Sequence, residues 1–409
     1  EQGLFRSVGV FVGGFGLDAA EFVWSKGISG EQSEGIAVLG PDVFDVLASL
    51  VDRSIVRQES QEGDPRFSML ETIRGFALEQ LIESREEDRV RTAHAEWCLS
   101  LAEGIRQTTF LPVGQRGLRR LEIEHANVRA ALDWLDRRGD RDRLLRLATA
   151  LGRFWFLDGH YDEGRSWLER ALTDYEGVDP LPSARAQFEL GQLYYLLGER
   201  ERGEALLEES IDVIRSHGDG LTFTDALVWK AWVATVRGDY DLAERLLEEV
   251  LGRAMNIPDP VAAAAATGKA LAHLGVVAHE RGDLEIARAR HDQALHAHRE
   301  LDDALGVIRS LRDLGDVARD QNDFAGALAS YRESLKLLGK WGDPLVVVNA
   351  LTGSALAAAA WGQPERAARL LGAAEAAREQ FRIGVNLPAD RAAHERGTAL
   401  VRAALGESV

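Results

Sequence analysis

A helical segment with a glycine in front of it recurs along this chain at nearly constant spacing. The clearest copy runs from Gly238 to Leu251, where a Gly-Asp turn precedes apolar residues at helical spacing. Related segments begin at Gly159, Gly198, Gly282, Asn322 and Gly362, so successive starts are 39, 40, 44, 40 and 40 residues apart. A fixed period of this size predicts a stacked array, because each repeat buries its apolar face against its neighbours.

Small residues recur at two fixed offsets from each turn residue. Seven positions before it stand Gly152, Gly191, Ala231, Gly275, Gly315 and Ala355. Five positions after it stand Gly164, Gly203, Ala243, Ala287, Ala327 and Ala367. Glycine in a helix costs about 1 kcal/mol relative to alanine, so its repeated use predicts two helices that approach closely here. Four positions further on are large residues, which a neighbouring repeat could receive: Leu168, Leu207, Leu247, His291, Tyr331 and Leu371.

The repeat predicts a mainly all-α chain with an α-solenoid of about six helical pairs over residues 144–380. The pairs are expected near 144–175, 184–215, 224–254, 267–299, 307–339 and 347–380, with a capping helix over 381–409. The uncharged stretch from Pro344 to Gly362 falls in the repeat register and contains three polar side chains. We therefore interpret it as a buried solenoid helix and expect no membrane association.

Composition excludes several function classes for this chain of 409 residues. Its formal net charge of −18 opposes a phosphate backbone, so we expect no direct nucleic-acid binding. The single cysteine, Cys98, excludes an internal disulfide and fits a reducing cytoplasm, where we expect the protein. The chain begins at Glu1 and not at a methionine, which indicates a piece of a longer protein.

Residues 1–84 differ from the repeats and predict a small winged-helix domain. Capping and apolar patterns indicate helices over Ala19 to Trp24, Val43 to Val51 and Glu71 to Ser84. Two strands are expected over Ser54 to Gln58 and Arg66 to Leu70, around a turn that contains Gly and Pro.

Residues 85–143 predict a helical linker that leads into the array. Thr92 to Ile105 and Gly117 to Arg138 each carry apolar residues at three- and four-residue spacing.

Two sets of residues carry a family resemblance. The small and large positions resemble the tetratricopeptide repeat (TPR), with Leu190-Gly191, Tyr194, Gly203 and Leu207 as the nearest match within one repeat. The period near 40, in place of that family's usual 34, resembles the sensor arms of STAND-class bacterial signal-transduction ATPases. The segments similar to the winged-helix region and linker helices of such regulators are Val10 to Phe15, Val46 to Ser54, Arg66 to Arg74 and Arg119 to Asp140.

This resemblance implies the C-terminal region of a transcriptional regulator of the AfsR or LuxR type, with an NB-ARC-like ATPase module preceding the winged helix. The nearest string to a phosphate-binding loop, Thr267-Gly268-Lys269-Ala270, lacks the hydroxyl and the first glycine. We therefore expect no cofactor in this chain, and ATP or ADP only in a missing upstream module. Met69-Leu70-Glu71 stands where such proteins carry Met-His-Asp, so the resemblance does not carry over a nucleotide-sensing histidine.

Residues that could carry chemistry do not form a recognisable catalytic or metal motif. His291 and His298 would lie about 10.5 Å apart along a helix, too far to share one ion. We therefore predict a protein that is not an enzyme, with no catalytic residues and no metal ligands.

The concave groove of the solenoid is the expected working surface. In the repeat family the first helix of each pair lines this groove, and the matching positions are Arg153, Phe156, Phe188, Gln192, Tyr195, Trp232, His279, Arg312, Asp316 and Arg319. The first half of this set is aromatic and the second half is charged. An aromatic residue here could either pack against its neighbour or contact a ligand or peptide, and both interpretations stay open.

The leading hypothesis is a regulatory arm, in which a small-molecule effector or a protein partner binds the groove and shifts a two-state equilibrium in the preceding ATPase module. The alternative is a TPR scaffold that joins proteins without any nucleotide switch. A winged helix that itself binds DNA is disfavoured, because Val43 to Leu50 contains Asp45 and no Lys or Arg.

Overall fold

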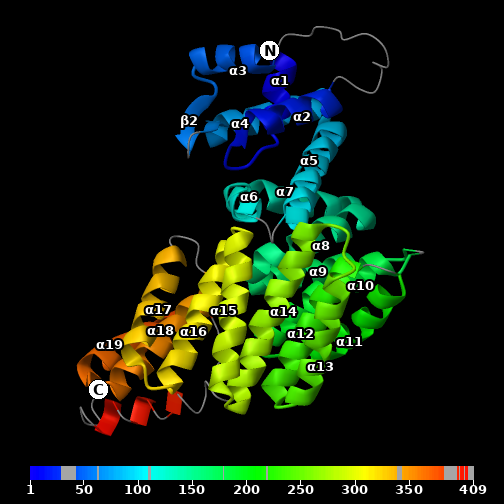
Figure 1. The fold of residues 1–409 in the computed structure, drawn as a ribbon. Coiled ribbons are helices and arrows are strands. Elements are labelled where there is room, and N and C mark those ends of the chain that lie inside the picture. Colours follow the sequence, from blue (N-terminus) through cyan, green and yellow to red (C-terminus); the bar gives the residue numbers. More distant parts are fainter. Residues whose placement is uncertain are drawn as a thin grey trace. The chain divides into compact units, whose positions relative to one another are not determined.

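The computed structural model describes residues 1–28, 43–61, 64–108, 112–177, 179–217, 220–338, 343–381, 394–395, 397–399 and 401–403. The chain is mainly all-α and divides into two compact units (Figure 1). The first unit contains residues 1–108, 116–151 and 170–176, and the second contains 109–115, 152–169 and 177–409.

The first unit begins with four helices and a small antiparallel sheet. In chain order these are α1 Gln2–Val8, β1 Phe15–Gly16, α2 Leu17–Gly27, α3 Val43–Asp52, β2 Arg57–Gln61, β3 Asp64–Ser68 and α4 Glu71–Glu83. The strand order is β1-β3-β2, and Phe15 lies opposite Phe67 with the ring centroids 5.9 Å apart. The sequence did not predict β1, because two residues are too few to show an alternating pattern.

The two hairpin strands were expected over 54–58 and 66–70, but they span 57–61 and 64–68, closer together in the sequence. After α3 the chain first closes a turn, in which the amides of Ile55 and Val56 both donate to the carbonyl oxygen of Leu50. Ser54 has a φ of 59° in this turn. Val56 is consequently a buried core residue that precedes the ladder, and pairing begins at Arg57. Residues 62 and 63 of the expected turn lie outside the described residues.

Three further helices follow in the first unit, α5 Glu87–Thr108, α6 Pro112–Ile123 and α7 His125–Arg138. One helix was expected over 117–138, but the structure interrupts it at Glu124, where ψ is 7°. The predicted division at residue 84 does not coincide with a boundary between compact units, because α5 packs against α2 and α7.

Six antiparallel helical pairs are present in the described part of the solenoid. They are α8 Arg141–Leu157 with α9 Tyr161–Leu172, α10 Leu181–Leu196 with α11 Arg200–Ser216, α12 Gly220–Arg237 with α13 Tyr240–Ala254, α14 Pro260–Arg281 with α15 Leu284–Glu300, α16 Ala304–Asp320 with α17 Phe324–Leu338, and α18 Pro344–Ala360 with α19 Pro364–Phe381. From α10 onward each helix packs against the next one in the chain (Figure 1). The prediction of a mainly all-α chain with about six such pairs is confirmed. Residues Arg141 to Leu151 of α8 belong to the first unit.

The turn residues that revealed the repeat share one backbone conformation. Gly159, Gly198, Gly238, Gly282 and Gly362 have φ between 75° and 89°, and Asn322 has 65°. This left-handed region is open to glycine and is tolerated by asparagine. The period therefore records a conformational requirement that repeats once per pair.

The close approach predicted from the small residues is present. A Cβ on Gly191 would lie 2.9 Å from the carbonyl oxygen of Gly203, and one on Gly203 would lie 2.7 Å from that of Gly191. In three pairs the large residue packs over the first-helix glycine of its own pair: Leu207 over Gly191, where an added Cβ would lie 2.9 Å from it, His291 over Gly275 and Tyr331 over Gly315. Leu207 also belongs to the apolar cluster that contains Phe223 and Ala226 of the next pair, so its contact with Gly191 does not exclude the neighbouring repeat.

Two further features are the long apolar helix α14 and the C-terminal segment. Among the described residues, α14 is the one helix long and apolar enough to cross a membrane by length and composition, and it packs between α13 and α15 as a solenoid helix. Most of the capping helix predicted over 381–409 lies outside the described residues. Within the described part, Val401 is buried in a cluster with Ala355, Ala358 and Leu371.

Candidate functional site

All ten predicted groove residues lie on first helices of pairs in the second unit. Arg153 and Phe156 are on α8, Phe188, Gln192 and Tyr195 on α10, Trp232 on α12, His279 on α14, and Arg312, Asp316 and Arg319 on α16. We call His279, Arg312, Asp316 and Arg319 the charged set, and the aromatic set is Phe156, Phe188, Tyr195 and Trp232.

Four rings from three different first helices form an aromatic cluster, which comprises Phe156, Tyr195, Trp229 and Trp232. The Trp229 and Trp232 centroids lie 5.0 Å apart, and Tyr195 lies 5.1 Å from Trp232. Trp229 also meets Tyr195 at 6.2 Å and Phe156 at 5.9 Å, all with edge-to-face geometry. Tyr195 is buried, whereas the other three rings keep part of their surface accessible.

Sequence reasoning missed Trp229, which is the ring that joins α8 to α12. It lies three residues before Trp232, and residues three apart share one face of a helix. That spacing was the signal that could have found it.

Two predicted groove residues contribute to packing instead. Phe188 is 4% exposed and belongs to the apolar core around α10 to α14. The Gln192 side chain is also buried, and its Nε2 donates to the carbonyl oxygen of Phe188 at 3.4 Å.

Two arginines lie over rings of the aromatic cluster. The Arg153 guanidinium is 5.2 Å from the Phe156 centroid, and that of Arg200 is 5.6 Å from the Tyr195 centroid. Burial and the positive charge of Arg309 lower the pKa of Arg153, while Asp225, Glu189 and Asp343 oppose this shift. Charged side chains from several other first helices therefore influence the pKa of Arg153.

The charged set is bound into a polar network within the solenoid. Asp316 accepts hydrogen bonds from Arg319 at 2.8 Å and from the Tyr331 hydroxyl of α17 at 2.7 Å. Arg319 also donates to Asp320, which pairs with His279 of α14 at 2.8 Å. Burial disfavours the charge of Asp320, but hydrogen bonds from His279 and Arg319 prevail and hold the pKa of Asp320 well below its usual value.

A second branch of the polar network surrounds Asp313. Arg312 forms an ion pair with Asp313, and His291 Nδ1 lies 3.9 Å from Asp313 Oδ2. Burial raises the pKa of Asp313 to about 6 and lowers the pKa of His291 to about 3. The network therefore joins Arg312, Asp316 and Arg319 to side chains of the second helices α15 and α17.

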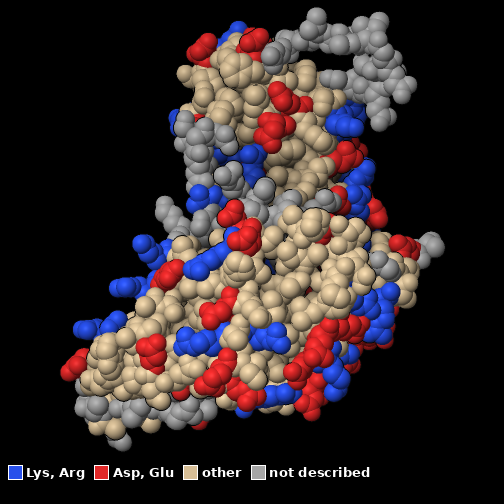
Figure 2. Space-filling view, viewed as in Figure 1, with Lys and Arg blue, Asp and Glu red and all other residues tan. Residues whose placement is uncertain are grey.

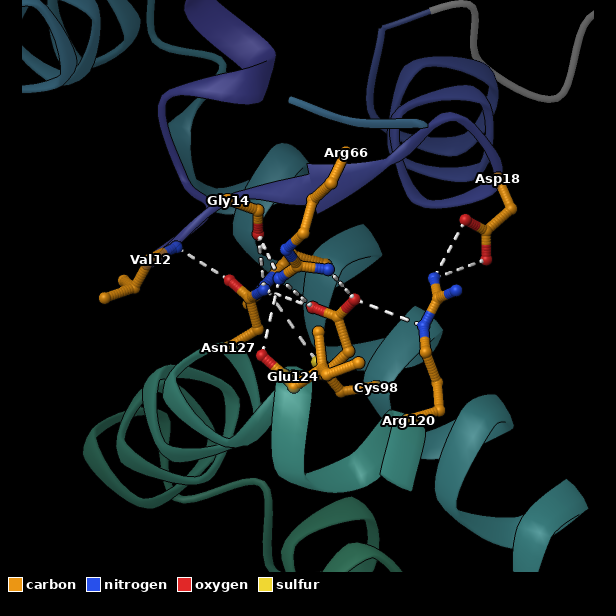
Figure 3. Close-up of polar contacts among 10 residues, drawn as sticks. Val12, Gly14, Asp18, Arg66, Cys98, Arg120, Glu124 and Asn127 are labelled. Carbon is orange, nitrogen blue, oxygen red and sulfur yellow. Dashed lines mark hydrogen bonds and ion pairs between the residues drawn. The ribbon is translucent and has the colours of Figure 1, made fainter. Parts of the chain in front are cut away.

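The first unit contains a separate buried polar centre at the junction of α6 and α7 (Figure 3). Glu124 has no exposed side-chain surface, and Arg66 of β3 donates to its two oxygens at 2.6 and 3.1 Å. Arg120 contacts Glu124 at 3.2 Å and also reaches Asp18 of α2 at 3.0 Å.

Asn127 connects this centre to the glycine loop between α1 and β1. Its Oδ1 accepts from the Val12 amide at 2.7 Å, and its Nδ2 donates to the Gly14 carbonyl oxygen at 2.9 Å and to Glu124 at 2.6 Å (Figure 3). Burial and the nearby Glu124 charge raise the pKa of the Cys98 thiol well above its usual value. Asn127 therefore fixes the loop although it lies more than a hundred residues away in sequence.

Surface charge is mixed in sign. On the coloured part of the face in Figure 2, basic and acidic side chains are interspersed. Several ion pairs connect one helical pair to the next, such as Arg281 with Glu244 at 3.0 Å and Arg165 with Glu199 at 3.1 Å. In these contacts, oppositely charged side chains of neighbouring repeats lie next to each other.

Comparison with known proteins supports the repeat architecture. The tetratricopeptide repeat family matches residues 266–340, which span most of α14 to α17. Over its whole length the chain is similar in fold to a STAND protein with a tetratricopeptide repeat sensor from Pyrococcus horikoshii, with a TM-score of 0.54, 15% identity and 54% of that chain covered.

Mycobacterial proteins provide the sequence relatives. Proteins of Mycobacterium tuberculosis and Mycobacterium bovis named as HTH-type transcriptional regulators are 37% identical over 174 residues. The match covers 42% of this chain and 18% of the relative. An uncharacterised M. tuberculosis protein is 39% identical over 90 residues, which make up 22% of this chain and 21% of that protein. The matched part is thus a small fraction of each relative.

Proposed function

We propose that this chain is the regulatory and sensor region of a STAND-type transcriptional regulator. Its first unit acts as the winged-helix region with the linker helices, and its solenoid binds a small-molecule effector or a protein partner. Binding controls an ATPase module outside this chain, where ATP or ADP is bound. The chain itself is not an enzyme, binds no nucleic acid directly and acts in the cytoplasm.

The aromatic cluster carries this proposal. Phe156, Trp229 and Trp232 keep accessible surface although they come from two separate first helices and touch one another. Large rigid rings provide much contact area at little entropic cost, so they are frequent anchors in binding interfaces. The accessible rings belong to the α8/α9 and α12/α13 pairs, so a bound partner would contact both pairs at once.

The charged set has a different part in the proposal. Arg312, Asp316 and Arg319 already bond to side chains within the solenoid. A ligand would have to replace those bonds to bind there. We therefore assign recognition to the aromatic cluster and not to the whole predicted groove.

Two comparisons support the regulatory part. The fold similarity is to a STAND protein with a repeat sensor, and the sequence similarity is to proteins named as transcriptional regulators. The second candidate function, a TPR scaffold without a switch, agrees with the repeat match alone.

Deletion of residues 144–409 from the full-length regulator tests the proposal. The release rate of bound nucleotide and the occupancy of operator DNA would be measured with and without the deletion. We expect both quantities to lose their dependence on the effector. Full-length protein whose nucleotide release and DNA binding are indifferent to the deletion would support the scaffold instead.

A further inference from the structure

The apolar core of the solenoid is continuous in one part and divided in another. A single cluster of buried residues extends from Ala184 on α10 to Val277 on α14. Beyond it, the described apolar residues form small separate clusters, such as Ala278, Ala287 and Val317, or Leu295, Leu311 and Leu314. Small clusters give less cooperative burial, and regions with little apolar burial open at lower free energy.

The division coincides with a change of residue type inside the helical pairs. At one repeat position the second helix carries Leu207 on α11 and Leu247 on α13, but His291 on α15 and Tyr331 on α17. Leu207 packs over Gly191 of its own pair, whereas Leu247 belongs to a pair with Ala231 at the matching place. A Cβ on Gly275 would lie 2.6 Å from the His291 ring, and one on Gly315 would lie 2.6 Å from the Tyr331 ring. Polar rings thus occupy the place that leucine fills in the preceding pairs.

These rings bring polar atoms into the interior of both pairs. His291 is 1% exposed, and its Nδ1 has no hydrogen bond, since the nearest acid, Asp313, is 3.9 Å away. Tyr331 is fully buried and donates to Asp316. A buried polar group without a full set of hydrogen bonds costs free energy that an apolar side chain would not.

We propose that α15, α16 and α17 form a hinge, which opens locally while the helices of the continuous apolar cluster, α10 to α14, remain closed. Repeats contact only their neighbours, so the stability of a solenoid can differ along its length. The polar network holds the hinge in one arrangement, and the divided apolar core makes that arrangement easy to leave. This inference goes beyond the proposed function and holds whether or not an effector binds the aromatic cluster.

Tyr331 gives the hinge its link to the next pair. Its ring lies against Gly353 of α18 as well as Gly315 of α16, because a Cβ on Gly353 would be 2.5 Å from it. Movement of this one side chain would therefore alter packing on both sides. The hinge ends at α18, whose interior returns to alanine-rich packing.

Native-state hydrogen exchange of the whole chain, read by mass spectrometry, tests the hinge. We expect amides of α15 to α17 to exchange at least about tenfold faster, after correction for intrinsic rates, than those of α11 to α13. Equal protection in the two regions would overturn the proposal.

Two substitutions should change this exchange in opposite directions. His291→Leu introduces the leucine that α11 and α13 carry at this repeat position and removes the buried polar ring, so exchange in α15 to α17 should slow about tenfold. Tyr331→Phe removes a donor to buried Asp316, so exchange there should quicken several-fold. Protection in α11 to α13 should not change in either variant.

His296→Leu is the matched control, because His296 is an exposed residue on the same helix as His291. It should leave exchange unchanged. If His291→Leu and Tyr331→Phe also leave exchange in α15 to α17 unchanged, His291 and Tyr331 do not control opening and the hinge is refuted. If His291→Leu prevents folding, acceleration by Tyr331→Phe confined to α15–α17 still supports the hinge, and a uniform effect contradicts it.

Discussion

The carboxylate of Glu124 is wholly buried, and Arg66, 58 residues earlier in the chain, donates to it at 2.6 Å. This pair joins strand β3 to the junction between α6 and α7. The linker helices are therefore an integral part of the first unit, which explains why compactness does not divide the chain at residue 84.

Arg66→Met should destabilise the first unit strongly. It leaves a buried carboxylate with only Arg120 and Asn127 as partners, and breaking a buried pair from one side costs about 3 kcal/mol or more. Urea unfolding would measure the loss. The control is Asp18→Asn, which breaks an exposed pair with Arg120 and should cost less than about 1 kcal/mol. Similar costs for both variants would contradict this account of the Glu124 centre.

Alanine at two glycines of the first unit should have opposite effects. Gly14 has a φ of 100°, and an added Cβ would lie 2.8 Å from the Phe67 carbonyl oxygen, so Gly14→Ala should cost about 2 kcal/mol or more. Gly75 lies within α4 with open space around it, so Gly75→Ala should stabilise by about 1 kcal/mol. Thermal unfolding of the two variants would give the signs, and a stabilising Gly14→Ala would show that the loop is not held as described.

The gain in stability from His291→Leu should depend on pH. Burial lowers the pKa of His291 to about 3, so below its ordinary value near 6.5 the open form binds more protons than the closed form. Acid therefore weakens the wild type through this group. The variant should be stabilised by about 2 kcal/mol more at pH 5 than at pH 8, as measured by urea unfolding.

Other titratable groups face His291 and remain in both proteins. They are His273 and His279 of α14 and Arg312, Asp313 and Asp316 of α16. The pKa of Asp313 is raised to about 6, which has the opposite effect in acid, so only the difference between variant and wild type isolates His291. A difference that is the same at both pH values would contradict a neutral, buried His291.

The repeat was predictable because its causes are local. A left-handed turn requires Gly or Asn, and a close helix crossing requires Gly or Ala, so both requirements appear in the sequence at fixed offsets. Helical periodicity then gave the pairs.

The features that the sequence did not predict involve contacts between residues that are distant in the chain. Glu124, at the break between α6 and α7, pairs with Arg66, and Phe15 of β1 lies opposite Phe67. Trp229 was missed because one repeat was compared with the next, while the aromatic cluster forms across three of them. The polar network is only partly local: Asp316 and Arg319 are three residues apart on one helix, but no local pattern indicates the contacts with Tyr331 and His279.

The most direct test concerns the aromatic cluster. The effector that activates the full-length regulator would be titrated into this chain by calorimetry, with Trp229→Ala and Trp232→Ala compared with Trp361→Ala, an exposed tryptophan outside the cluster. We predict that each cluster variant weakens binding at least about tenfold, as expected for an anchor residue, while Trp361→Ala binds as the wild type does. Unchanged affinity in both cluster variants would contradict the assignment of effector recognition to this surface.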